Sequence, residues 1–375
     1  MLARPRRHAR RRILHVIPTL WSGAGDALTH LCELQSVRED VMVVTSGLRG
    51  TLADWPAYRR RLRIAGVRHV SIDTFARTPE ALWPSVERLR DLAGAWSPDV
   101  VHTHAGVPTL AWALARSSFH ARHIAHMYSW GAGRPAWMND MDLAGFRAAD
   151  RVVCSAKRYE RLLLDGGVEK TRLAYIPWGV RVDRVDAALA SRRPSTGLRI
   201  GFVGRVEPRK GQLDLIAAFA QVRRHVPEAE LAFVGPDADA DYAARCRDEV
   251  ARLGLEAHVR WHGHVPDVAR VLVHWQLFVS LSSDEGQGLA VQEAMAARVP
   301  VVVMAAPGLE DFVSDGRTGR VVRSRKPAEV ARAIVATLRD PRGSARMARA
   351  AERLVRDRYG WTRCAAAIDR LYRAR

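Results

Sequence analysis

Residues 284–295 have the sequence Asp284-Glu285-Gly286-Gln287-Gly288-Leu289-Ala290-Val291-Gln292-Glu293-Ala294-Met295. The glycines predict a loop, and the apolar spacing after it predicts a helix that begins at about Gly288. Glu285 then lies on the loop and Glu293 lies early in the helix, where the helix dipole favours an anion. The free N–H groups of the first turn, including that of Leu289, suit a bound phosphate. Two carboxylates that can accept hydrogen bonds from hydroxyls, beside a phosphate site, indicate a nucleotide-sugar pocket; the alternative is a solvated helix with two surface acids.

A second segment, residues 201–211, also follows a predicted strand and opens a predicted helix. Gly204 and Arg205 stand at the carboxyl end of that strand, and Lys210 stands at the helix start. An arginine and a lysine that converge beside free helical N–H groups would neutralise a diphosphate. Both side chains are expected to face solvent or ligand, so that folding should not need them, and Arg209 is expected to be solvated. The alternative is a basic turn on a basic protein.

Short apolar runs alternate with helical periodicity along the rest of the chain. Strands are predicted at residues 13–17, 41–44, 99–102, 123–127, 151–154, 174–177, 199–203, 229–234, 259–261, 277–280 and 300–304. Repeated strand–helix units predict an α/β protein with two Rossmann-like, doubly wound parallel-sheet domains. Ligands bind at the carboxyl ends of such strands, so two facing domains would form a cleft.

The pattern also predicts where the domains end. We expect a disordered basic tail over residues 1–12, a first domain over 13–180, a linker over 181–197 and a second domain over 198–355. The remaining residues, 356–375, continue a helical pattern that starts at about Pro341 and runs through Tyr359-Gly360-Trp361.

Composition restricts the class of protein. The 375 residues include 59 Lys and Arg against 40 Asp and Glu, and the net charge of +19 would attract phosphates, anionic lipid or nucleic acid. The predominance of arginine is also typical of a GC-rich bacterial genome. Four dispersed cysteines without a CxxC pair favour free thiols in a reducing compartment. The apolar run after the arginine-rich tail is short and is interrupted by His15 and Pro18, so a cytoplasmic protein is favoured over a secreted one.

The two segments resemble motifs of glycosyltransferase family 4, whose members are retaining enzymes with the GT-B fold. The resemblance implies donor-sugar contacts for Glu285, ribose contacts for Glu293, and diphosphate binding by Arg205 and Lys210. It also implies donor-binding positions at Gly204, Gly286, Gly288 and Leu289.

The sequence departs from the family pattern at several positions. Gln287 replaces an aromatic residue, and Trp178 replaces an asparagine, which puts any hydrogen-bonding role at that position in doubt. Arg298 replaces a glycine at a position suited to a left-handed helix C-cap, so we expect modest backbone strain there.

In the first half the motifs are weaker. Residues 22–26 form a predicted loop in which Gly23 and Gly25 resemble the first family loop, near the donor phosphate or the acceptor; the alternative is a tight turn. His102 and His104 end one predicted strand and His126 ends the next. His126 either contacts the sugar near the point of transfer or is a buried histidine with satisfied hydrogen bonds. Because the sequence shows no HExxH and no Cys/His cluster by spacing, no metal site is expected.

The resemblance therefore implies a retaining hexosyltransferase, with a nucleoside diphosphate sugar as donor and no further cofactor. Its first domain would bind an unidentified acceptor (a glycan, a lipid-linked or a small molecule) in cell-surface glycan, glycolipid or natural-product glycoside synthesis. The terminal helix would pack back on that domain. Two alternatives remain open: a nucleotide-sugar epimerase on the same fold, and a non-catalytic basic protein that binds nucleotides or nucleic acid. No specific nucleic acid is expected, whereas peripheral association with an anionic membrane is.

Overall fold

The computed structural model describes residues 10–47, 56–72, 78–128, 135–192 and 197–374, and predictions for residues 1–9 and 193–196 lie outside them. The chain divides into two compact units. Unit 1 comprises Met1–Pro177 and Ala365–Arg375, and unit 2 comprises Trp178–Cys364. Each unit is described below by itself.

Unit 1 contains a parallel sheet that has seven strands among the described residues, in the order β3-β2-β1-β4-β5-β6-β7. The strands are β1 (Arg12–Val16), β2 (Asp40–Ser46), β3 (Arg68–Ile72), β4 (Val100–His104), β5 (Arg122–Met127), β6 (Arg151–Cys154) and β7 (Leu173–Tyr175). β1 and β4 are buried along almost their whole length, as expected for central strands of a doubly wound sheet. The order reverses between these two strands, so the switch point of unit 1 lies at their carboxyl ends.

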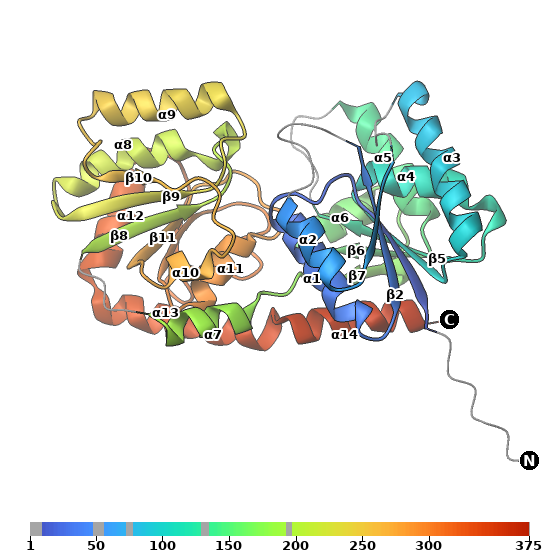
Figure 1. Cartoon of the computed structure of the whole chain (residues 1–375). Helices are drawn as coiled ribbons and strands as arrows, with labels where there is room; N and C mark the ends of the chain where they lie inside the picture. Colours follow the sequence, from blue (N-terminus) through green and yellow to red (C-terminus); the bar gives the residue numbers. More distant parts are fainter. Residues whose placement is uncertain (1–9, 48–55, 73–77, 129–134, 193–196, 375) are drawn as a thin grey trace, which may run out of the picture. The chain divides into compact units, whose positions relative to one another are not determined.

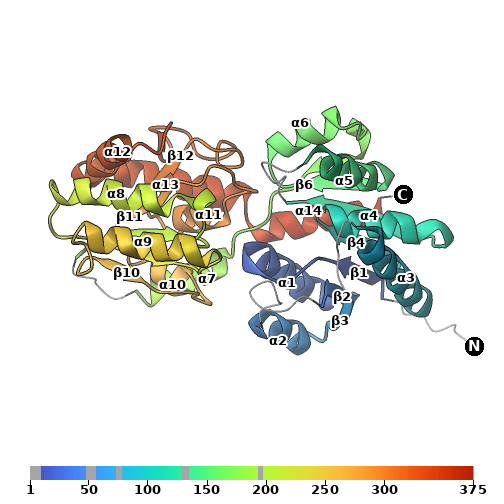
Figure 2. The ribbon, with the colours of Figure 1, turned by 90° about the horizontal axis from the view of Figure 1, so that it is seen from above.

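Helices cover both faces of this sheet. They are α1 (Ser22–Ser36), α2 (Pro56–Ile64), α3 (Pro79–Trp96), α4 (Gly106–Ala115), α5 (Ala136–Ala148), α6 (Lys157–Asp165) and the last helix of the chain, α14 (Trp361–Arg373). One face packs its aliphatic side chains against α3, α4, α5 and α6. The other face meets α1 and the unit 1 part of α14, and α1 and α2 lie side by side (Figure 1 and Figure 2).

Unit 2 contains a parallel sheet with six strands among the described residues, in the order β10-β9-β8-β11-β12-β13. The strands are β8 (Leu198–Val203), β9 (Ala229–Val234), β10 (Val259–Trp261), β11 (Leu277–Ser280), β12 (Val301–Met304) and β13 (Arg320–Val322). The order reverses between β8 and β11. The switch point of unit 2 therefore lies at the carboxyl ends of those two strands.

The helices of unit 2 divide between the two faces of its sheet. They are α7 (Val182–Ala190), α8 (Gln212–Arg223), α9 (Ala240–Arg252), α10 (Ala269–Leu272), α11 (Leu289–Ala296), α12 (Pro327–Arg339) and α13 (Pro341–Arg358). Helices α8, α9 and α12 bury one face, and α7, α10, α11 and α13 bury the other. Figure 1 shows α8 and α9 above this sheet and α10 and α13 below it.

The predicted fold class is confirmed, because both sheets are parallel and doubly wound. The apolar runs identified most strands to within two residues at either end, but β3 and β13 were missed. Both are edge strands, and the exposed Arg68 and the half-buried Arg320 break their apolar pattern. Edge strands bury less surface, so their hydrophobic signal is weaker.

Three boundaries differ from the sequence prediction. Helix α7 occupies most of the predicted linker, because its acidic first turn and its buried Val185 and Ala188 suit a helix. Arg11 bonds to Glu39 at 2.6 Å and Arg12 begins β1, so the last residues of the predicted tail belong to the fold of unit 1.

The C-terminal helical pattern is interrupted as well. At Tyr359 the backbone leaves the helical conformation, and its carbonyl accepts a bond of 2.7 Å from the N–H of Val180. Gly360 forms a parallel bridge with the same residue. The predicted single helix is therefore two, α13 and α14. None of the helices in the described ranges has the length and apolarity that a membrane span requires.

Candidate functional site

The switch point of unit 2 brings together the two segments that the sequence singled out. Arg205 follows β8, and Lys210 ends the one-turn 3-10 helix η4 (Pro208–Lys210), which precedes α8. Glu285 lies on the loop between β11 and α11. Because β8 and β11 are neighbours in the sheet, their carboxyl ends place these loops next to each other.

An ion pair connects the two loops directly. The Nζ of Lys210 lies 2.5 Å from an Oε of Glu285, and the two side chains are only 11% and 16% exposed. Burial raises the pKa of the Glu285 carboxyl, but the charge and the hydrogen bond of Lys210 act against it, and the pKa is lowered overall. The pair therefore holds a carboxylate and an ammonium together. Contrary to the sequence prediction, the Lys210 side chain is buried in an ion pair and does not face solvent. Its removal is therefore expected to affect the stability of the fold as well as the binding of any ligand.

Two arginines share a single carboxylate on the β8 side. Arg205 and Arg209 approach the same oxygen of Glu207, at 3.0 and 2.8 Å. Burial lowers the pKa of the Arg205 guanidinium. Arg209 is not simply solvated, because it also donates a bond of 2.6 Å to the carbonyl of Asp284 on the other loop. Two guanidinium groups share one carboxylate here, so the local charge is positive and favours the binding of a further anion.

Arg325 positions both loops, and the sequence did not identify it. Its Nε donates to the carbonyl of Leu281 at 2.8 Å, and its two terminal nitrogens donate to the carbonyls of Pro208 and Arg209. One guanidinium thus satisfies backbone acceptors of both segments. In a chain so rich in arginine, residue type alone carries no signal for this role.

Gln287 and Trp178, both departures from the family pattern, contact each other. The Gln287 carboxamide accepts a bond from the N–H of Trp178 at 2.6 Å and donates one to its carbonyl at 2.8 Å. It also donates to Gln292, the second polar side chain buried under the loop. The hydrogen bonds at position 178 therefore come from the backbone, which removes the need for an asparagine there.

Helix α11 begins where the sequence predicted. Gly288 has φ +73° and caps the helix, and a Cβ there would lie 2.3 Å from Leu309, so only glycine fits. Leu289 is the first residue of the helix and belongs to its first turn. Glu293 is half-buried in the second turn, and Gly286 lies on the preceding loop. Their roles toward a nucleotide stay predictions.

Arg298 has φ +58°, as the missing glycine implied. The N–H of the next residue, Val299, donates to the carbonyl of Ala294, which closes a left-handed C-cap. The guanidinium of Arg298 donates a hydrogen bond of 2.6 Å to the carboxylate of Glu352. The backbone bond of the cap thus holds the strained conformation, and the ion pair lies on the exposed side of it.

The prediction of a glycine-rich loop over residues 22–26 of unit 1 is wrong, because these residues are helical. Gly23 and Gly25 lie in the first turn of α1, which starts at Ser22. A Cβ on Gly25 would lie 2.6 Å from the backbone of Leu20, and its N–H donates to the carbonyl of Trp21. Close packing of the preceding chain against the helix explains this glycine, and any ligand role of the pair stays a prediction.

Four fully buried histidines lie on one face of the unit 1 sheet. They are His15 on β1, His102 and His104 on β4, and His126 on β5. Burial lowers the pKa of His15 to about 4 and that of His126 to about 3, and it lowers the pKa of the other two as well. His126 has no exposed surface here, and its ring lies 4.8 Å from that of Tyr128.

His15 is the member of this group that the sequence did not connect with the others. It pairs in register with His102 across β1 and β4. Sequence spacing cannot show such a pair, but a histidine at the carboxyl end of each predicted central strand is a usable signal, since those ends meet at the switch point.

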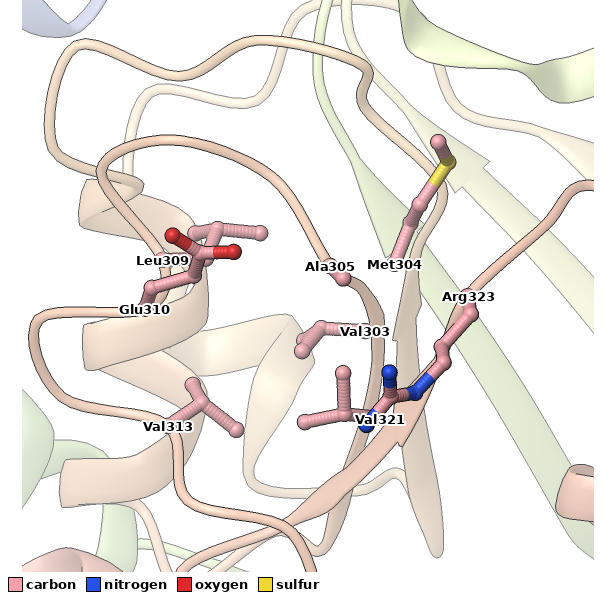
Figure 3. A pocket seen from close by; sticks show the side chains of 8 residues that line it. All are labelled: Val303, Met304, Ala305, Leu309, Glu310, Val313, Val321 and Arg323. Carbon is pink, nitrogen blue, oxygen red and sulfur yellow. The ribbon is translucent and has the colours of Figure 1, made fainter.

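A pocket of about 230 Å³ lies in unit 2, at the carboxyl ends of β12 and β13 (Figure 3). Its lining is mostly apolar, with Glu310 and Arg323 as its charged residues. Leu309 separates it from Gly288, because this side chain both lines the pocket and packs against the cap of α11. None of the predicted site residues lines it. The charged side chains that the sequence singled out meet instead at the switch point.

Comparison with known proteins agrees with this geometry. The profile described as "Glycosyltransferase Family 4" matches residues 21–184, and the profile described as "Glycosyl transferases group 1" matches residues 189–354. The chain belongs to glycosyltransferase family 4. Its two sheets are those of the GT-B fold.

Named relatives of this transferase have different substrates. A "Glycogen synthase" of Mycobacterium tuberculosis is 30% identical over 260 residues, which are 66% of this chain and 62% of that protein. The match thus spans less than two thirds of that relative's length. A "D-inositol 3-phosphate glycosyltransferase" of Geodermatophilus obscurus is 28% identical and covers 89% of this chain and 84% of that protein.

A solved structure confirms the fold of the transferase. HepE from Anabaena, crystallised in complex with UDP and glucose, superposes with a TM-score of 0.82 over 96% of this chain and 99% of its own. At 20% identity this likeness concerns the fold alone.

Proposed function

We propose that the enzyme transfers a sugar from a nucleoside diphosphate sugar to an acceptor and retains the configuration at the anomeric carbon. The observation that carries the proposal is the buried Lys210–Glu285 ion pair at the switch point of unit 2. The pair supports this function because an ammonium suited to bind phosphate lies beside a carboxylate that can accept hydrogen bonds from sugar hydroxyls.

The diphosphate would bind between the β8 loop and the start of α11. Arg205 and Lys210 supply two cations, and the free N–H groups at Leu289 supply the partial positive charge of a helix terminus. Negative charge develops on the diphosphate as the bond to the sugar breaks. Donors that are already in position stabilise it without further reorganisation, so this arrangement favours departure of the nucleoside diphosphate.

The ion pair also suggests how the site changes on binding. Lys210 and Glu285 neutralise each other in their ion pair. A diphosphate gives the ammonium a second anionic partner, which leaves Glu285 able to accept hydrogen bonds from the donor sugar. Glu293, one turn into α11, would accept from the ribose hydroxyls. HepE, which was crystallised with UDP and glucose, supports a donor of this class.

Release of nucleoside diphosphate from a purified preparation tests the proposal. Nucleoside diphosphates and their sugars are first screened by thermal shift, since a ligand of the folded state raises the melting temperature. The best donor is then incubated with the wild type, with Lys210→Ala and with Lys326→Ala, an exposed lysine of the same unit as matched control. We expect release by the wild type and the control and little release by Lys210→Ala.

The products separate the alternatives. Release of nucleoside diphosphate with an α-configured product from an α-configured donor supports retention, and an inverted product contradicts it. A changed sugar still attached to the nucleotide would identify an epimerase. Binding without any product, combined with salt-sensitive retention of RNA or DNA, would favour the non-catalytic alternative.

A second proposal concerns the place of action. The arginine-rich residues before β1 and the net charge of +19 favour contact with the anionic inner face of a membrane, where a lipid-linked acceptor would be presented. Sedimentation with neutral and anionic vesicles at low salt measures this. Equal and negligible binding to both would leave the charge without a membrane role.

A further inference from the structure

Three histidines of unit 1 lie close together on β1 and β4, the two strands that flank the switch point of its sheet. His15 of β1 and His102 of β4 are partners in the ladder, and His104 lies two residues further along β4. Alternation along a strand puts all three on the same face of the sheet. All are fully buried, and one ring nitrogen from each lies within 4.8 Å of one from each of the others.

Each imidazole has one nitrogen held by an oxygen outside the group. The Nε2 of His15 lies 2.8 Å from the Oε1 of Gln35 on α1. The Nδ1 of His102 lies 2.6 Å from the hydroxyl of Tyr372 on α14, and the Nδ1 of His104 bonds to the hydroxyl of Tyr128. If these nitrogens donate their N–H to the oxygens, the opposite nitrogen of every ring carries the lone pair with which an imidazole can bind a metal.

Two of the opposite nitrogens lie close to each other. The Nδ1 of His15 and the Nε2 of His104 are 3.0 Å apart, which is a hydrogen bond when one of them carries a proton and a pair of facing lone pairs when neither does. The Nε2 of His102 is buried and has no hydrogen-bond partner among the residues that the structure describes. A buried polar atom without a partner is costly, so a fully buried cluster of this kind calls for a further binding partner.

We propose that His15, His102 and His104 bind a zinc ion. Three neutral imidazoles without a thiolate or carboxylate suit a borderline metal such as zinc, and a set of three histidines leaves one position for water. The outer oxygens of Gln35, Tyr128 and Tyr372 would orient the rings, as oxygen partners commonly do for histidines that bind metals. This goes beyond the proposed sugar transfer and does not depend on it, since the donor site lies in unit 2.

The ion would connect three elements that the sheet alone does not fix. Its ligands lie on β1 and β4, and their oxygen partners lie on α1 and α14 and after β5. Gln35 also donates to the hydroxyl of Tyr372 at 3.3 Å, so the two helices share one hydrogen-bonded shell. Such a shell defines the ring orientations before the metal binds, which favours tight binding.

Zinc stoichiometry of the full chain tests the proposal. The protein is stripped with a chelator, incubated with zinc sulfate, desalted and analysed by mass spectrometry for metal per chain. We expect one zinc per wild-type chain. His102→Gln should retain only a small fraction of it, and Tyr372→Phe should weaken zinc binding about 10–100-fold.

His123→Gln is the matched control. His123 is also a fully buried histidine of the same sheet, but it points to the opposite face, where its Nε2 lies 3.0 Å from the hydroxyl of Thr103. It should keep the full zinc content. A wild type that takes up no zinc, or a His102→Gln that binds as much as the wild type, would overturn the proposal.

A variant that fails to fold does not stop the test. In that case the wild type is loaded with cobalt, and its visible absorption is measured. A strong spectrum typical of four-coordinate cobalt supports the buried site, whereas the weak spectrum of six-coordinate cobalt contradicts it.

Discussion

At the switch point of unit 2, Lys210 and Arg205 each lie against a glutamate, whereas at the switch point of unit 1 three imidazoles lie against one another. The two sheets have the same order around these points. Burial keeps the unit 1 histidines neutral by lowering their pKa, while close pairing keeps the unit 2 residues charged. The comparison teaches that topology fixes where a ligand can bind, and that the side chains placed there decide its chemistry.

Breaking the charged pair should have the largest effect. We expect Lys210→Ala to lower donor turnover by about 10²–10³, because a cation on the leaving group is lost. It should also lower the free energy of unfolding, toward the lower end of roughly 3–5 kcal/mol, since Glu285 is left buried without its partner. Chemical denaturation and a nucleoside diphosphate release assay measure the two effects.

A double variant separates them. Lys210→Met combined with Glu285→Gln removes both charges and should recover most of the stability without recovering turnover. Lys326→Ala serves as the control for loss of a lysine from unit 2. Wild-type turnover and stability in Lys210→Ala would show that the pair contributes to neither.

Low pH should lower the free energy of unfolding of unit 1, because its buried histidines are neutral in the folded state. His123 lies apart from the other four buried histidines, so its contribution can be measured separately. Burial lowers the pKa of His123 to about 3, so below its usual value of about 6.5 the unfolded chain binds a proton that the folded chain does not. Its contribution to stability is therefore constant above about pH 6.5 and declines as the pH falls toward 3. At pH 5 the loss is about 2 kcal/mol.

His123→Gln removes this titration. Its melting temperature should fall less than that of the wild type between pH 7 and pH 5, although it starts lower because the bond to Thr103 changes. Identical pH profiles for the two proteins would contradict a neutral, buried His123.

The two glutamates of unit 2 should fail differently. Glu293 is assigned to the ribose, which both the free nucleotide and the donor carry, so Glu293→Ala should weaken nucleoside diphosphate binding roughly tenfold or more. Glu285 is assigned to the sugar, so Glu285→Ala should change that affinity much less and lower donor turnover. Calorimetric titration and the release assay measure both. Equal losses of nucleotide affinity in the two variants would show that the roles are assigned wrongly.

Charged contacts outside the switch point should affect stability but not turnover, and their effect on stability should be smaller than that of the Lys210–Glu285 pair. Arg298 has φ +58° and its guanidinium is 62% exposed, so its bond to Glu352 contributes little. Arg298→Gly relieves the backbone and should be about 1 kcal/mol more stable than Arg298→Ala, which loses the same ion pair but keeps the strain. Thermal unfolding compares them. Both should keep wild-type turnover; a loss of turnover in either would extend the functional site beyond the switch point.

Local patterns identified much of the fold and of the candidate site. Apolar runs marked the central strands because buried strands carry a continuous hydrophobic signal, and they missed β3 and β13, where most residues are only partly buried or are exposed. The glycines before α11 and the cap at Arg298 were also visible, because the need for a left-handed backbone is set by a single residue.

The sequence by itself thus determined two parallel sheets, the position of α11 and the residue types around the proposed nucleotide-sugar site. Only the tertiary structure decided that Lys210 pairs with Glu285, that Gln287 binds the backbone of Trp178, and that His15 meets His104. These partners lie 75, 109 and 89 residues apart. Strand order and register bring them together, and no local pattern encodes which distant strand becomes a neighbour.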